Sequence, residues 1–324
     1  MSRSGITGKA AEIEKDLENK VRMYRGMAEK SPRDFAGALG VALKDLATLY
    51  LDTGRPDKGE VTLEEALTVF RKMAVSSPKT FLPYVASILD LLGNVCARKG
   101  LITGTTERAE YWYNEAVKTY RGLAVSAPET YLPSVAETLN HLGALYAHTA
   151  RPEKAEGCYS DALSIQRGLV KSAPEGLMPA LAVTLRNLAQ LYAYTNRPER
   201  AESCYDEALN IHRGLAKSAP EESLFDVASN LYELAVLYMN TRRPDRGEAA
   251  FVEAAQILGC LSERRPSMFS GDLTGAAYSG LMTAIQDSLM QVYMQVRGLS
   301  EEESESRVSD ILEAAGSKCA GYGL

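Results

Sequence analysis

The sequence predicts an all-α protein built from tandem helical hairpins, and three observations predict it. The stretch that begins at Leu139 repeats 46 residues later, from Leu185, without a gap, so the chain contains an array of similar units. Within each unit, apolar residues recur at the i, i+3, i+4, i+7 spacing of one helix face, and no window alternates as a strand would. A proline ends each unit, at Pro32, Pro78, Pro128, Pro174, Pro220 and Pro266.

Length, charge and hydropathy limit the class of protein. The chain has 324 residues, more than the ~250–300 at which one hydrophobic core usually stops growing. Its net charge of −6 argues against nucleic-acid binding, which normally requires a basic face. No run approaches ~18 consecutive apolar residues, and residues 1–20 lack the apolar core of a signal peptide, so we expect no membrane span. The five cysteines are far apart and favour a reducing, cytoplasmic location.

Residues 1–32 are expected to form an N-terminal capping helix. They align with the second helix of a repeat, but Ile13 and Lys20 stand where an internal repeat has Ala155 and Ala162. A polar residue on the stacking face is typical of a terminal cap, because no further repeat covers that face.

Five repeats follow, and each is expected to hold two helices. In the third repeat the first helix is expected from about Pro133 to Thr149. The chain then restarts at Pro152, since proline is tolerated at a first helical position, and the second helix stops before Pro174. The five repeats span residues 33–78, 79–128, 129–174, 175–220 and 221–266.

Two segments depart from this regular pattern. Residues 100–108, GLITGTTER, replace the short Arg-Pro turn of the other repeats and make the second repeat four residues longer. Residues 267–324 are expected to form a degenerate sixth hairpin with a tail of small residues.

The recurring residues resemble the signature of the tetratricopeptide repeat. That signature is Leu-(Gly/Ala)-x-x-Tyr in the first helix, followed by a small residue, an aromatic residue and an alanine in the second. The third repeat carries it as Leu142, Gly143, Tyr146, Ala155, Tyr159 and Ala162. The fourth repeat carries it as Leu188, Ala189, Tyr192, Ala201, Tyr205 and Ala208.

The resemblance covers about residues 35–266 and implies a right-handed superhelix of stacked hairpins. The repeat is 46 residues rather than the usual length of about 34, which implies longer helices and a similarity to kinesin-light-chain-like and prokaryotic arrays. Small residues such as Gly143 are expected to let helices approach closely. The pairs Arg121-Gly122, Arg167-Gly168 and Arg213-Gly214 are expected to be architectural, with close packing to compensate for the glycine.

First helices line the concave surface of tetratricopeptide arrays, so the resemblance implies a partner-binding groove along them. The residues at the inward positions differ from repeat to repeat, as a recognition surface would, although an ordinary solvated face is the alternative. His141 and Glu233 lie next to these positions. The predicted groove residues are Lys44, Asp90, Asn94, Arg98, Asn140, His148, Arg186, Asn187, Gln190, Tyr194, Tyr232 and Asn240.

No motif predicts catalysis, a metal site or a cofactor. The sequence contains no glycine-rich phosphate loop, no G-x-S-x-G and no H-E-x-x-H. His141 and His148 are seven residues apart rather than three or four, and no further ligand completes a metal site nearby. Cys158 and Cys204 occupy equivalent positions and are expected to be buried, structural cysteines.

These features favour a non-enzymatic module that binds a segment of another protein. Two alternatives remain open. One is a regulatory sensor that takes a small peptide or metabolite, and the other is a structural scaffold that self-associates. The insertion in the second repeat, on one edge of the array, suits either binding or self-association.

Overall fold

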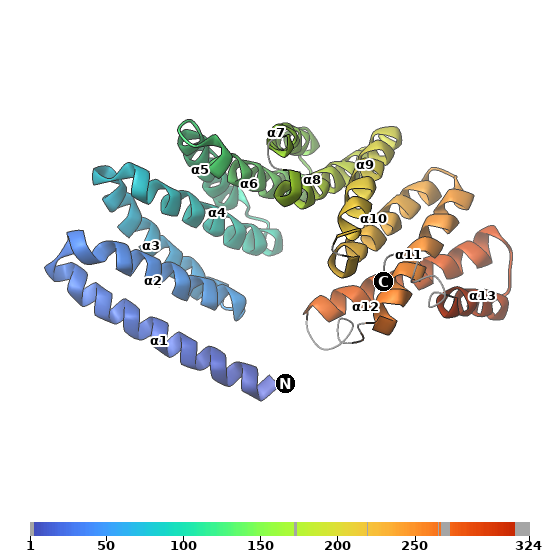
Figure 1. Ribbon diagram of the computed structural model, residues 1–324, viewed down its shortest axis with the longest axis horizontal. Coiled ribbons are helices and arrows are strands. Elements are labelled where there is room, and N and C mark those ends of the chain that lie inside the picture. The colour runs from blue at the N-terminus through green and yellow to red at the C-terminus, as the bar shows by residue number, and fades with distance from the viewer. Residues whose placement is uncertain (1–2, 172–173, 219, 265, 267–272, 315–324) are drawn as a thin grey trace. The chain divides into compact units, whose positions relative to one another are not determined.

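The computed structural model describes residues 3–171, 174–218, 220–264, 266 and 273–314 (Figure 1). These residues form thirteen consecutive α-helices and one short π-helix, and they contain no strand. The prediction of an all-α fold of tandem helical hairpins is confirmed.

The chain divides into two compact units, Met1–Leu169 and Val170–Leu324. Unit 1 begins with α1 (Arg3–Lys30). Its hairpins are α2 (Pro32–Asp52) with α3 (Pro56–Ser76), α4 (Pro78–Thr103) with α5 (Glu107–Ala124), and α6 (Pro128–His148) with α7 (Pro152–Val170). Unit 2 holds α8 (Pro174–Tyr194) with α9 (Pro198–Ala216), α10 (Pro220–Asn240) with α11 (Pro244–Arg264), and then α12 (Leu273–Gln291), the π-helix η2 (Val292–Val296) and α13 (Glu301–Glu313).

First helices begin earlier than the sequence analysis places them. α6 begins at Pro128 rather than near Pro133, because a proline at the first helical position gives up no intrahelical hydrogen bond. Pro133 lies inside α6. The proline that ends one repeat in the sequence is therefore the first residue of the next helix.

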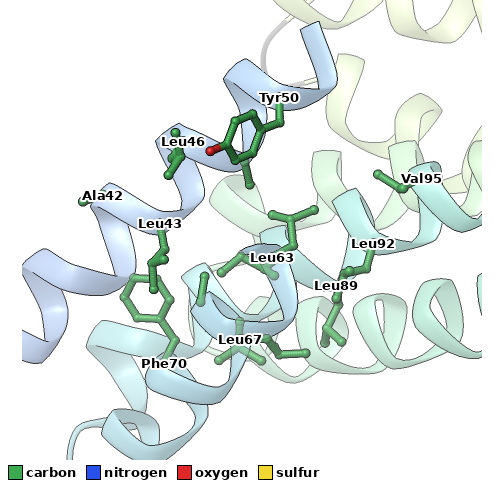
Figure 2. Packing of buried hydrophobic residues seen from close by; sticks show 14 of the residues in the cluster. Ala42, Leu43, Leu46, Tyr50, Leu63, Leu67, Phe70, Leu89, Leu92 and Val95 are labelled. Carbon is green, nitrogen blue, oxygen red and sulfur yellow. The ribbon is translucent and has the colours of Figure 1, made fainter. Parts of the chain in front are cut away.

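A continuous apolar core joins α2, α3 and α4 in unit 1 (Figure 2). Leu43 and Leu46 of α2, Leu63 and Phe70 of α3 and Leu92 of α4 are each at most 5% exposed. The apolar stripe of one helix thus meets the stripes of the next two, and a single hairpin could not bury these side chains alone.

Glycine on a first helix lets the second helix of its hairpin approach closely. A Cβ added at Gly143 of α6 would lie 2.6 Å from Cε1 of Tyr159 on α7, which is closer than carbon atoms approach one another. Tyr159 is 3% exposed and fills the space that the missing side chain leaves. The close approach predicted at Gly143 is confirmed.

The glycines of the recurring Arg-Gly pairs do not follow the prediction. A Cβ added at Gly122, Gly168 or Gly214 would meet no atom within 4 Å, so close packing does not compensate for glycine there, and that prediction is wrong. The arginine is the architectural member. Nη2 of Arg121 lies 2.9 Å from Oδ2 of Asp161 and joins α5 to α7. Nothing in the structure explains the glycines.

A turn within the repeat carries a recurring arginine cluster. In the third repeat the chain leaves α6 through Ala150, whose φ of 53° is in the left-handed region, and Arg151 follows. Nη1 of Arg151 donates to Oε2 of Glu110 on α5 at 2.6 Å, and its guanidinium lies 4.5 Å from the centre of the Tyr146 ring. This cluster connects a turn to the second helix of the preceding repeat.

The same cluster recurs elsewhere but is replaced in the second repeat. Arg55 bonds to Glu14 and Arg243 bonds to Glu202, both at 2.6 Å. Where the insertion lengthens α4, a buried carboxylate binds different cations. Oε2 of Glu60 lies 2.7 Å from Nζ of Lys99, and Oε1 of Glu60 lies 2.8 Å from Nη1 of Arg108.

Among the described residues, α4 is the one helix long and apolar enough to cross a membrane by length and composition alone. Half of the most apolar 18-residue stretch of α4 is buried inside the protein, where α4 packs between α3 and α5. Ile88, Leu89 and Leu92 are at most 1% exposed, and the helix also carries Asp90 and Lys99. This burial is that of a core helix.

Candidate functional site

The predicted groove residues divide between the two units, and all lie on the first helices of repeats. Unit 1 places Lys44 on α2, Asp90, Asn94 and Arg98 on α4, and Asn140 and His148 on α6. Unit 2 places Arg186, Asn187, Gln190 and Tyr194 on α8, and Tyr232 and Asn240 on α10.

In unit 1, two predicted residues belong to a hydrogen-bond network between repeats. Oδ1 of Asp90 lies 3.2 Å from Nδ1 of His141 on α6, and Oδ2 accepts from Nδ2 of Asn94 at 3.2 Å. The hydroxyl of Tyr113 on α5 donates to Oδ1 of Asn94 at 2.9 Å. Asp90 and Asn94 therefore connect three helices, and their polar atoms already have partners within the protein.

The network also shifts the titration of His141. Burial alone would lower the pKa of His141, but the hydrogen bond that its ring donates to Asp90 and the negative charges of Asp90 and Glu137 outweigh it and raise the pKa. His141 is thus held toward its charged form, which strengthens its bond to Asp90.

The remaining predicted residues of unit 1 differ in exposure. Arg98 and His148 are exposed near the carboxyl ends of α4 and α6, and Nδ1 of His148 lies 2.8 Å from the carbonyl oxygen of Ala144. Lys44 is half-buried, and Asn140 is only 9% exposed. Arg98 and His148 are therefore the accessible members of this set.

Unit 2 contains a cavity of about 280 Å³ between α8, α9 and α10. Three predicted residues line it, Gln190, Tyr232 and Asn240. Tyr205 of α9 and Glu233 of α10 line it as well. The structure thus brings together part of the predicted set around one hollow, with aromatic, amide and carboxylate groups facing it.

Glu233 is the charged group of this cavity. Its Oε1 accepts from Nε2 of Gln190 at 2.7 Å. Its Oε2 is buried and receives no hydrogen bond from any residue that the structure describes. Burial raises the pKa of Glu233, although the charge of Arg186 and the polar groups of Gln190 and Tyr205 act to lower it.

Two tyrosines near the cavity offer different kinds of contact. The Tyr232 ring packs against Phe251, with 5.7 Å between ring centroids, so its position is fixed. Tyr194, in the last turn of α8, is 74% exposed. A large amphipathic side chain with that exposure can contribute contact area to a partner.

Sequence reasoning missed Tyr205 and placed Glu233 only beside the groove. Tyr205 is the aromatic residue of the repeat signature, so its sequence position indicates a packing role. Tyr205 lines the cavity because α9 packs against both α8 and α10, and no spacing within one helix encodes that. No group of three or more His, Cys, Asp or Glu side chains within the described residues could hold a metal ion.

Cys96, Cys158 and Cys204 have reduced thiols. Cys158 and Cys204 are half-buried rather than fully buried, and burial raises the pKa of Cys158 to about 11. Cys96 is buried in α4. Cys260 of α11 is disulfide-bonded, which the wide spacing of the cysteines does not predict.

The consecutive helical hairpins define an array of helical repeats, and comparisons with known proteins specify its class. The family model of the tetratricopeptide repeat matches residues 134–214, so the resemblance seen in the sequence is confirmed. No curated protein matches the sequence.

Two solved structures share the fold. BtubC (BKLC) from P. vanneervenii has a TM-score of 0.61 at 23% identity, over 81% of this chain and 93% of that one. A variant of a kinesin-light-chain-like protein from Podosopora anserina, with nearly identical TPR-like repeats, has a TM-score of 0.51 at 15% identity, over 69% of this chain and 95% of that one. Both likenesses concern the fold.

Proposed function

We propose that this chain is a non-enzymatic interaction module whose first helices bind a segment of a partner protein. Tetratricopeptide-repeat proteins are commonly protein-interaction scaffolds, and a preformed helical surface suits docking of an extended or helical segment. The observation that best supports this proposal is the cavity in unit 2, where Gln190, Tyr232 and Asn240 surround the carboxylate of Glu233.

The chemistry of the cavity suits one anchor side chain of such a segment. Its volume of about 280 Å³ is at the lower limit of ordinary ligand pockets, which measure roughly 300–1,000 Å³. The carboxylate of Glu233 is the charged group in the lining and accepts hydrogen bonds, so the anchor would end in an N–H or O–H donor. Tyr194 would cover the segment next to the anchor, since buried tyrosines often dominate the energy of an interface.

Site-specific photo-crosslinking tests this proposal. The photoreactive amino acid p-benzoylphenylalanine would replace Tyr194, and a matched chain would carry it at Tyr111, which is 52% exposed on α5. In the native cell, we expect one protein to be crosslinked from position 194 and not from position 111. Crosslinks from position 111 alone, or only between copies of this chain, would contradict the proposal.

A second measurement identifies the groove rather than a chance neighbour. The exposed residues Tyr194 and Asn240 would be changed together to alanine, with Tyr111→Ala as the control. The affinity of the crosslinked partner should fall at least tenfold for the double variant and stay unchanged for the control. Equal affinities would place binding on another face.

A further inference from the structure

We propose that the first repeat holds a separate binding site for an aliphatic chain that ends in a carboxylate. A cavity of about 900 Å³ is lined by residues of α1, α2, α3 and the start of α4 in unit 1. None of the predicted groove residues lines it. The site is therefore independent of the function proposed above.

The walls of this cavity are apolar. Leu39 of α2, Val69 and Met73 of α3, and Phe81 of α4 all line it, together with Ala36. Such walls can bury the hydrocarbon part of a ligand, and removing its apolar surface from water favours binding.

The cavity exists because the first repeat has smaller side chains than the others. Ala36 stands at the position that Leu82, Leu132, Met178 and Leu224 occupy in the later repeats. Gly37 stands where the next three repeats have Pro83, Pro133 and Pro179. A Cβ added at Gly37 would lie 3.5 Å from Cε of Met73 and 3.6 Å from Cε1 of Phe81, so two lining residues pack beside this glycine.

The same repeat adds positive charge around the cavity. Arg33 stands where the third, fourth and fifth repeats have Glu129, Glu175 and Glu221. Lys72 stands where the following repeats have Gly122, Gly168 and Gly214. In the part of the chain that the structure describes, neither Arg33 nor Lys72 forms an ion pair.

The other charged residues that line the cavity do not cancel this positive charge. Arg25 bonds to Glu65 at 2.8 Å, and Glu29 is the one carboxylate among the residues that line the cavity. α2 and α4 also begin there, and the positive ends of their dipoles favour an anion. An anionic group therefore complements the charged side of the cavity.

An alkyl chain suits the walls better than a peptide does. A buried peptide backbone needs a hydrogen-bond partner for each amide, and leaving one without a partner is unfavourable. The polar lining residues Ser76, Ser77 and Thr80 are all exposed, and the buried or half-buried walls are hydrocarbon, thioether and aromatic groups. A hydrocarbon chain makes no such demand, and its terminal carboxylate would meet Arg33 and Lys72.

Calorimetric titration of the full chain with dodecanoate tests the proposal. We expect saturable binding of one dodecanoate per chain, and binding at least tenfold weaker for dodecyltrimethylammonium, which has the same alkyl chain with a positive end. The methyl group of Met73, assigned in an NMR spectrum by Met73→Leu, should shift on addition of dodecanoate. Absence of saturable binding, or equal binding of the two amphiphiles, would overturn the proposal.

Variants that install residues of the later repeats separate the two parts of the site. Ala36→Leu should weaken dodecanoate binding at least tenfold by filling the cavity, and Arg33→Glu with Lys72→Gly should weaken it about tenfold by removing the charge. Lys79→Glu, an equal charge reversal in the first turn of α4 and outside the lining, should leave binding unchanged. Unchanged binding by Ala36→Leu, or a hydrophobic peptide that saturates the site while dodecanoate does not bind, would refute the assignment.

Discussion

Arg151 bonds back to Glu110 of the preceding repeat, with 2.6 Å between Nη1 and Oε2, although 41 residues separate them in the sequence. The other carboxylate oxygen accepts from the Tyr146 hydroxyl at 2.8 Å. The guanidinium lies over the Tyr146 ring, and its Nε donates to Oγ1 of Thr149 at 3.0 Å. One carboxylate thus fixes a turn and a first helix onto the second helix of the preceding repeat.

We expect Arg151→Ala to lower the free energy of unfolding by about 1–2 kcal/mol, because it removes a charge-assisted hydrogen bond and a ring contact. The two side chains are 31% and 25% exposed, so solvent screens the pair only in part. Arg151→Lys should restore less than half of the loss, since an ammonium cannot bond to Glu110 and lie flat on the Tyr146 ring together.

Urea unfolding followed by circular dichroism measures this effect. Arg121→Ala is the matched control, because Arg121 also joins two repeats of unit 1 but its pair with Asp161 is 53% and 60% exposed. It should cost less than about 0.5 kcal/mol. Equal losses for the two alanine variants would show that the cluster at Arg151 adds nothing beyond a surface ion pair.

The sequence predicts the helical hairpins because every repeat of the array has to meet the same packing requirement. Leu142, Gly143 and Tyr159 recur as one pattern, since every hairpin has to bury the same face against its neighbours. The sequence does not predict in the same way which carboxylate Arg151 binds. Several carboxylates are close to Glu110 in the sequence, and only the stagger of neighbouring helices decides which one the arginine meets.

The groove residues show the same limit. The resemblance to tetratricopeptide repeats places Asp90, Asn94 and Gln190 on first helices, where the structure has them. It does not reveal that Asp90 bonds to His141 or that Gln190 bonds to Glu233, because these contacts cross between repeats. Polar residues that vary between repeats can therefore serve stacking as well as recognition.

Two glycine-to-alanine substitutions should have opposite effects on stability. Gly143→Ala should destabilise by about 1–3 kcal/mol, because its Cβ would meet the buried Tyr159 ring and force it to move. Gly122→Ala should stabilise by about 0.5–1 kcal/mol, because its Cβ would meet nothing within 4 Å and alanine favours a helix. Denaturation midpoints of the two variants and the wild type decide this. Destabilisation by Gly122→Ala would reveal a demand for glycine that is not local packing.

The histidines of the two units should respond to pH in opposite directions. Burial, together with the charge of Arg186, lowers the pKa of His212 below 6.5 despite the nearby Asp226. The folded protein then binds fewer protons than the unfolded chain, so this contribution to stability is present above about pH 6.5 and is lost as the pH falls. The raised pKa of His141 has the reverse consequence, a contribution present below about pH 6.5 and lost as the pH rises through the folded-state pKa.

Unfolding free energies between pH 5 and pH 8 distinguish these contributions. His212→Gln installs the residue that the preceding repeat has at this position, Gln166. The unfolding free energy of this variant should fall less on acidification than that of the wild type. His141→Asn installs the residue that the following repeat has at this position, Asn187. The unfolding free energy of this variant should fall further below that of the wild type as the pH falls. Parallel pH profiles for the wild type and either variant would contradict the corresponding assignment.

Glu60 should stabilise the second repeat, where the insertion displaces the usual arginine cluster. Its side chain is 8% exposed, and burial would raise its pKa, but the hydrogen bond from Lys99 and the charges of Arg108 and Lys99 lower the pKa overall. Its contribution is therefore present above about pH 4.5 and is lost as the pH falls through the folded-state pKa. Glu60→Gln should cost about 1–3 kcal/mol at pH 7, because it removes the charge that two cations share.

The matched control is Glu64→Gln, since Glu64 also binds Arg108 at 2.8 Å but is 44% exposed. Its cost should stay below about 0.5 kcal/mol. Urea unfolding at pH 7 and at pH 4 completes the test. The difference between the wild type and Glu60→Gln should shrink at pH 4, because below about pH 4.5 the unfolded chain binds a proton at Glu60, and the stability that the ionised carboxylate gives the folded protein decreases. A difference that is equal at the two pH values would mean that Glu60 acts by shape rather than by charge.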